Sequence, residues 1–184
     1  VSAEKTADVA YGFDRGMYIR LDRNPLPVLY PPEAVFEIGK AKVLRDGKDV
    51  VLFAIGAAVH SALEAAEEIQ TKSGKSVAVV DIYSIKPLDR KCVLKYAKQC
   101  SLAVTVEEHN ICGGLFGAVS ECISEEDHAC RVYPIAIQEV YPHGNAVDRG
   151  REALGLNGAG IRKTVLKLLR QMSSRREEAG DGSD

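Results

Sequence analysis

Four short runs rich in Val, Ile and Leu recur along the chain, and each is followed by a segment of helical character. The runs lie at residues 50–55, 77–82, 102–106 and 131–137. Continuous β-branched runs of this length are typical of strands buried on both faces of a sheet. The segments between them place apolar residues at helical spacing, at residues 58–72, 89–98 and 115–123.

This alternation predicts an α/β fold with a mostly parallel sheet and helices on both faces, in three layers. One strand is expected to be antiparallel. Residues 37–45 have strand character, and Asp46-Gly47 separates them from the run at 50–55, which is a signal for a β-hairpin. Asp89 is expected to cap the start of its helix, and Gly74 to end the helix before it. Two helices at residues 148–154 and 160–172 complete the predicted fold.

The two ends of the chain differ from this central part. Residues 2–13 predict a helix and residues 17–21 a strand, which are too little to bury a core. We therefore interpret residues 1–22 as the last helix and strand of another domain, and the chain as a piece of a longer protein. Residues 23–35 contain four prolines and predict an extended linker. Residues 36–172 form the main domain, and the polar residues 173–184 are predicted to be disordered.

Composition narrows the class of protein. Of 184 residues, 46% are hydrophobic and 27% charged, which is usual for a globular protein that buries a core. The net charge of −2 gives no basic surface for nucleic acid or an anionic membrane. Five cysteines without a C-x-x-C pair indicate free thiols in a reducing compartment, and the cytoplasm is expected. The spacing of His109, Cys112 and Cys122 matches no common zinc finger, so no metal site is expected.

Candidate chemistry gathers after the run at 102–106, where Glu107, Glu108 and His109 stand at the carboxyl end of a predicted strand. They are suited to act as acid, base or metal ligand, or to form a polar patch that holds a neighbouring subunit. Gly113 and Gly114 either let the backbone turn into the next helix or present amides to an anion. Dinucleotide, P-loop and G-x-S-x-G motifs are missing, and residues 36–172 contain no complete active site.

A second candidate lies where the predicted strand at 17–21 meets the linker. Arg20, Asp22 and Arg23 are close together there. The planar fork of an arginine binds phosphate oxygens in pairs, so a phosphate-bearing ligand is one possibility. A surface salt bridge with Asp22 is the other. His60 on the helix at 58–72 is more typical of a packed or surface histidine, and His143 lies in a predicted turn without a recognisable role.

Several segments together resemble the C-terminal part of a transketolase. They are YIRLDRNP at 18–25, FEIGKA at 36–41, DIYSIKPLD at 81–89, and TVEEH at 105–109 with the later glycine pair. The resemblance runs in order across about residues 16–172 and is greatest to the separate C-terminal section of split transketolases. Similar domains occur in 1-deoxyxylulose-5-phosphate synthase and in the beta chains of 2-oxo acid dehydrogenases.

The resemblance implies an enzyme that uses thiamine diphosphate and Mg²⁺ to move a two-carbon ketol unit between sugar phosphates. The cofactor lies between an N-terminal domain and the pyrimidine-binding domain of a partner subunit in a homodimer. The metal-binding G-D-G motif and the glutamate that activates the cofactor have no counterpart here. This chain alone is therefore expected to bind no cofactor and to be inactive, and its partner would be the N-terminal, pyrimidine-binding portion of the same enzyme.

The resemblance also assigns roles to residues. Arg23 matches the arginine that grips the substrate phosphate. Glu107, Glu108, His109, Gly113 and Gly114 match a segment that is structural and contacts a subunit. A non-catalytic interaction domain of a dehydrogenase beta chain, and a synthase that takes pyruvate as donor, are the alternatives.

Overall fold

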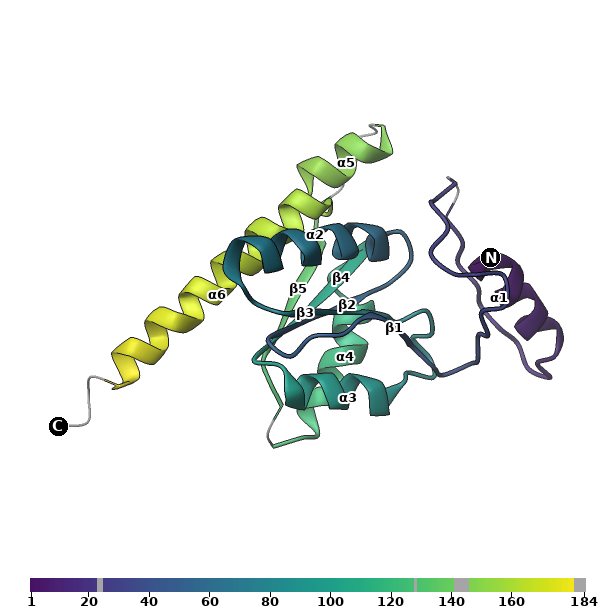
Figure 1. Ribbon diagram of the computed structural model, residues 1–184. Helices are drawn as coiled ribbons and strands as arrows, with labels where there is room; N and C mark the ends of the chain where they lie inside the picture. The colour runs from purple at the N-terminus through teal and green to yellow at the C-terminus, as the bar shows by residue number, and fades with distance from the viewer. Residues whose placement is uncertain (23–24, 128, 141–145, 181–184) are drawn as a thin grey trace.

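A computed structural model describes residues 1–22, 25–127, 129–140 and 146–180 (Figure 1). Its centre is a five-stranded sheet in the order β1-β3-β2-β4-β5. The strands are β1 Lys42–Arg45, β2 Val50–Ala54, β3 Val77–Asp81, β4 Leu102–Asn110 and β5 Val132–Ile137. The helices are α1 Ser2–Tyr11, α2 Ala58–Ser73, α3 Arg90–Gln99, α4 Leu115–Ser124, α5 Val147–Ala153 and α6 Gly158–Gly180.

The sheet is covered on both faces, which confirms the predicted three layers (Figure 1). Successive side chains of a strand point to opposite faces, so β2 supplies both cores. Val50, Leu52 and Ala54 pack with α2 and α6 on one face. Val51 and Phe53 pack with α3 and α4 on the other. All five residues of β2 are fully buried, which explains why its sequence is apolar throughout rather than alternating.

Local signals placed the helix ends correctly. The Asp89 carboxylate accepts a hydrogen bond from the Cys92 amide at 3.0 Å and caps α3. Gly74 ends α2 in the left-handed conformation, with φ of 67°.

The predicted hairpin between β1 and β2 is wrong. One antiparallel strand is present, but β1 pairs with β3, whereas β2 pairs in parallel with β3 and β4. Because both edges of β2 are taken by these longer parallel ladders, β1 cannot pair with β2 and pairs with the outer edge of β3. The chain after β1 crosses the start of β3 at Gly47, where an added Cβ would lie 2.5 Å from the amide nitrogen of Ala78. Asp46-Gly47 therefore makes a crossing rather than a hairpin turn.

Three further predictions need correction. Residues 17–21 lie outside every strand of the described chain, because an extended segment becomes a strand only when it pairs with another. β4 continues past residue 106 to Asn110, since the Ile111 amide and β5 extend its ladder. Residues 173–180, predicted to be disordered, continue α6. Within the described residues, no helix combines the length and the apolar character that crossing a membrane requires.

The crossing at Gly47 yields a stability prediction. Gly47→Ala places a methyl group against the backbone of β3, which cannot move without disturbing the sheet, and should lower the free energy of unfolding by about 2–3 kcal/mol. The matched control is Gly117→Ala inside α4, where an added Cβ meets no atom within 4 Å. It should be neutral or stabilising by up to about 1 kcal/mol. Urea unfolding measures both, and equal effects would contradict the crossing.

Candidate functional site

The carboxyl ends of the parallel strands form the edge where an α/β sheet usually binds its ligands. From β2 the chain goes through α2 to β3 on one side, and β4 and β5 lie on the other. The connections therefore diverge between β2 and β4, and a crevice at such a point is the usual ligand site. At this edge the last part of β4 contains Glu107, Glu108 and His109, and the loop after β4 contains Gly113 and Gly114.

The side-chain carboxylate of Glu107 caps the N-terminus of α4. Its side chain is 1% exposed, and its two oxygens accept hydrogen bonds from the backbone amides of Leu115 at 2.6 Å and Phe116 at 2.8 Å. These amides begin the helix and have no partner within it, and the helix dipole favours a negative charge at this point. Glu107 thus joins the end of β4 to the start of α4.

The two glycines make this cap possible. Gly113 has φ of +79°, in the left-handed region that side chains rarely adopt. At Gly114 an added Cβ would collide with the Glu107 carboxylate and come within 2.9 Å of the His109 ring. The alternative that this loop presents free amides to an anion is therefore wrong, because the carboxylate of Glu107 already takes that position.

Glu108 lies at the centre of an ion-pair cluster that joins three distant parts of the chain. The Arg151 guanidinium on α5 donates from Nε to the Glu108 carboxylate, and from Nη2 at 3.3 Å. The same nitrogen lies 3.5 Å from the Asp22 carboxylate. Arg20 donates to the Glu108 carbonyl at 3.4 Å. The hydrogen bond that Arg151 donates to Glu108 raises the pKa of Arg151 above its usual value, so this charge is permanent. From the sequence we named Arg20, Asp22 and Glu108 as candidate site residues, but we did not identify Arg151.

The other predicted residues take no shared part in a site. His109 is exposed, and its Nδ1 lies 2.8 Å from the carbonyl oxygen of Asn110. His60 is half-buried on α2, and burial lowers its pKa. Arg23 and His143 lie outside the described residues.

A second polar cluster, which the sequence analysis missed, lies at the end of β3. Asp81 is 6% exposed and accepts a hydrogen bond from the Tyr30 hydroxyl at 2.5 Å. The ammonium of Lys42 lies 5.9 Å from the centre of the Tyr30 ring. Burial raises the pKa of Asp81 to about 6, while Tyr30 and Lys42 act in the opposite direction. The hydrogen bond to Asp81 attaches Tyr30 to the sheet. In the sequence, the only sign of this cluster is a polar residue, Asp81, at the end of an apolar strand.

In the part of the chain that the structure describes, no group of three His, Cys, Asp or Glu side chains is arranged so that it could hold a metal ion. The start of α4, which could receive a diphosphate group, is closed by Glu107. The described residues therefore do not fit a thiamine diphosphate and magnesium site.

Comparison with known proteins decides the family. Residues 39–161 match the family described as transketolase, C-terminal domain. The chain belongs to this family.

The relatives that this chain matches are longer than the chain itself. A protein of Methanocaldococcus jannaschii that bears the name of a transketolase C-terminal section is 36% identical over 157 residues, which is 84% of this chain and 48% of that protein. The 1-deoxy-D-xylulose-5-phosphate synthase of a Synechococcus strain is 39% identical over 128 residues, which is 70% of this chain and 20% of the synthase. The chain thus spans about half of the first relative and a fifth of the second.

A solved structure agrees with the fold. The structure titled as a split gene transketolase, an inactive beta4 tetramer, superposes with a TM-score of 0.73 at 34% identity. The match covers 79% of this chain and 47% of that one. The predicted resemblance and fold class are both confirmed.

The cap by Glu107 yields a second prediction. Glu107→Ala leaves the buried amides of Leu115 and Phe116 without an acceptor and should lower the free energy of unfolding by about 2–3 kcal/mol. Glu121→Ala, which removes an exposed glutamate from the same helix, is the control and should change it by under about 0.5 kcal/mol. Chemical unfolding compares the two, and a small effect of Glu107→Ala would show that the cap is dispensable.

The Asp81 cluster yields a prediction about pH. The pKa of Asp81 is about 6 in the fold and about 3.9 in the unfolded chain, so the fold favours the protonated form. This contribution to stability is present at low pH and lost as pH rises from about 4 to about 6. Asp81→Asn stays neutral, so its free energy of unfolding relative to the unaltered chain should rise across that interval by up to about 3 kcal/mol.

Urea titrations at pH 4 and pH 7 measure this difference, with the exposed Asp127→Asn as control. A difference for Asp81→Asn that is the same at both pH values would contradict the assignment.

Proposed function

We propose that this chain is the C-terminal section of a thiamine-diphosphate-dependent transketolase that transfers a two-carbon ketol unit between sugar phosphates. The observation that carries the proposal is its 36% identity to a transketolase C-terminal section along 84% of its own length. The section serves assembly and contributes a phosphate ligand, and it is inactive alone. The free thiols of the five cysteines are in keeping with a cytoplasmic protein.

The partner that we propose is the pyrimidine-binding portion of the same enzyme, within a homodimer. The N-terminal segment of this chain supports a missing neighbour. α1 buries none of its residues against the sheet domain, and Tyr11 and Tyr18 are 96% and 90% exposed. The segment therefore leaves these side chains free to pack against the proposed partner. Contact of Glu108, His109 and the following loop with a second subunit is part of the same proposal.

Arg23 is the residue that we propose to bind the substrate phosphate. It follows Asp22 in the sequence, and Asp22 lies at the carboxyl edge of the sheet through its ion pair with Arg151. A guanidinium group binds phosphate oxygens through two parallel hydrogen bonds. Thiamine diphosphate and Mg²⁺ belong to the complete enzyme, where the cofactor supplies an electron sink for the ketol unit.

The second candidate function is that of a 1-deoxyxylulose-5-phosphate synthase, favoured by the 39% identity to the Synechococcus enzyme. Its donor is pyruvate, so the donor distinguishes the two. From the sequence we also named the C-terminal domain of a 2-oxo acid dehydrogenase beta chain, which would dock another component instead of binding a sugar phosphate.

The test is a coupled ketol-transfer assay on the chain, with and without the proposed pyrimidine-binding partner portion added in trans. The mixture contains thiamine diphosphate and Mg²⁺, with xylulose 5-phosphate and ribose 5-phosphate as substrates. We expect activity only in the complete mixture. Arg23→Ala should raise the KM for sugar phosphate by about 10- to 100-fold, because a charge-assisted pair is lost.

Arg15→Ala is the matched control, since Arg15 lies in the same segment and its side chain is 82% exposed. A folded, associated mixture without ketol transfer would contradict the proposal. Activity with pyruvate and glyceraldehyde 3-phosphate in its place would identify the synthase.

A further inference from the structure

The ion-pair cluster around Arg151 connects segments that are far apart in the sequence. Its guanidinium reaches Glu108 at the end of β4 through two nitrogens, and Asp22 of the N-terminal segment at 3.5 Å. The Asp148 carboxylate, one turn earlier on α5, lies 3.7 Å away. Arg20 adds a second link from the N-terminal segment, since it donates to the Glu108 carbonyl. Sheet, helix and N-terminal segment therefore meet at one side chain.

Burial makes these contacts more than a surface ion pair. The Arg151 side chain is 17% exposed, and those of Glu108 and Asp22 are each 26% exposed. Exposed pairs contribute little, but partly buried and bidentate pairs hold their geometry. Asp148, at 96% exposed, is a minor member. The contacts that matter are those to Glu108 and Asp22.

The charges make the position of the N-terminal segment depend on Arg151. Glu108 and Asp22 both carry carboxylates, and the guanidinium of Arg151 lies between them. Without this charge, two partly buried carboxylates would face each other and repel. Residues 14–22 are otherwise mostly exposed and form no helix or strand. Loss of Arg151 should therefore release the segment, whereas loss of Asp22 should only loosen it.

We propose that Arg151 is a positioning residue that holds residues 20–22 against the carboxyl edge of the sheet. The proposal rests on the function proposed above, because the residue assigned there to the substrate phosphate is the next one in the sequence. Arg151 itself contacts no substrate in this assignment. It sets where the N-terminal segment leaves the sheet domain and enters the rest of the enzyme.

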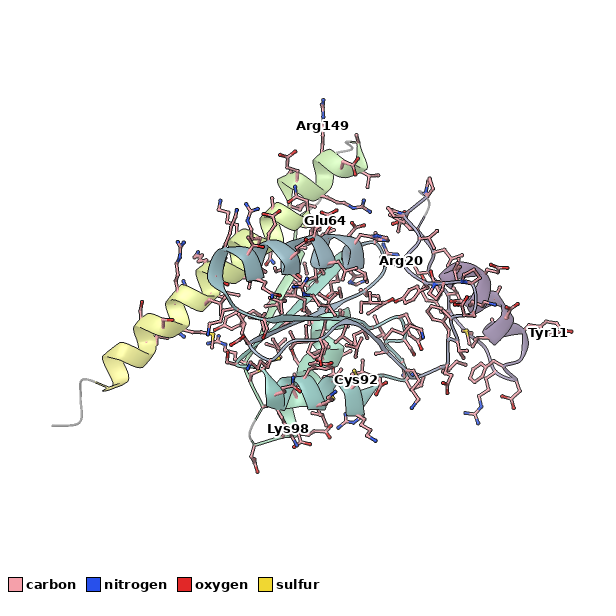
Figure 2. All side chains as sticks on the ribbon, in the orientation of Figure 1. Tyr11, Arg20, Glu64, Cys92, Lys98 and Arg149 are labelled. Carbon is pink, nitrogen blue, oxygen red and sulfur yellow. The ribbon has the colours of Figure 1, made fainter. Side chains whose placement is uncertain are left out.

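The first test uses the complete chain and limited digestion with trypsin, followed by mass spectrometry. Cleavage after Arg20 should be about fivefold faster in Arg151→Gln than in the unaltered chain, because a released segment fits a protease more readily. Arg149→Gln is the matched control. It removes one trypsin site from the same helix, and its side chain projects away from the domain (Figure 2). Equal cleavage in all three proteins would overturn the proposal.

The second test measures sugar-phosphate kinetics in the reconstituted mixture. Arg151→Gln should raise KM about fivefold with kcat nearly unchanged, and Asp22→Asn should raise it less. The double variant should be impaired less than Arg151→Gln alone, because Asp22→Asn removes the carboxylate that repels Glu108 once the guanidinium is gone. A fall in kcat at constant KM, or independent effects of the two changes, would overturn the positioning role.

The two proposals fail in different ways. An unaltered mixture without ketol transfer would contradict the proposed function, and digestion alone would then decide whether Arg151 holds the segment. Circular dichroism reports whether Arg151→Gln folds. If it does not, Asp22→Asn replaces it in both tests, since it leaves the pair between Glu108 and Arg151 intact.

Discussion

The position of β2 at the centre of the sheet determines the rest of the architecture. β2 pairs in parallel with β3 on one side and β4 on the other, so both of its edges are filled by hydrogen bonds. Its residues are buried on both faces, because helices cover the sheet above and below. A strand in this environment leaves no place for a hairpin partner, and β1 therefore pairs at the outer edge of β3.

The same central strand creates the crevice between β2 and β4, where α/β proteins commonly bind ligands. In this chain a carboxylate of its own occupies the helix start at that place. The Glu107 carboxylate accepts hydrogen bonds from the amides that would otherwise bind an anion. Gly114, which has no side chain, leaves the space that this carboxylate fills. The edge is thus used to join elements of the fold. Such a use agrees with a domain whose proposed role lies in assembly.

Two polar clusters connect the preceding chain to this domain. Tyr30 is bound to Asp81 at the end of β3, and Asp22 to Arg151 beside the end of β4. Both lie at the carboxyl ends of strands, so the chain from the N-terminal segment passes along the same edge of the sheet. The two clusters respond differently to pH. Asp81 has a pKa of about 6 and changes its charge near that pH, whereas Arg151 stays charged, so a pH titration distinguishes them.

The sequence alone determined the class of fold, the helices and most of the strands. Apolar runs and helical spacing are local signals, and Asp89 and Gly74 act on the helix ends beside them. The family followed from short motifs in a fixed order, and the match at residues 39–161 confirmed it. Glu107, Glu108 and the glycine pair were recognised as a candidate site for the same reason, because they are neighbours along the chain.

Only the tertiary structure decided which strands pair and which charges meet. The pairing of β1 with β3 depends on both edges of β2 being occupied by β3 and β4, and no local pattern encodes that occupancy. Arg151 lies 43 residues from Glu108 and was not a recognisable candidate until folding brought them together. Tyr30 and Asp81 are 51 residues apart, and burial alone makes their contact significant. Such contacts depend on the packing of distant elements, whereas the elements themselves depend on neighbouring residues.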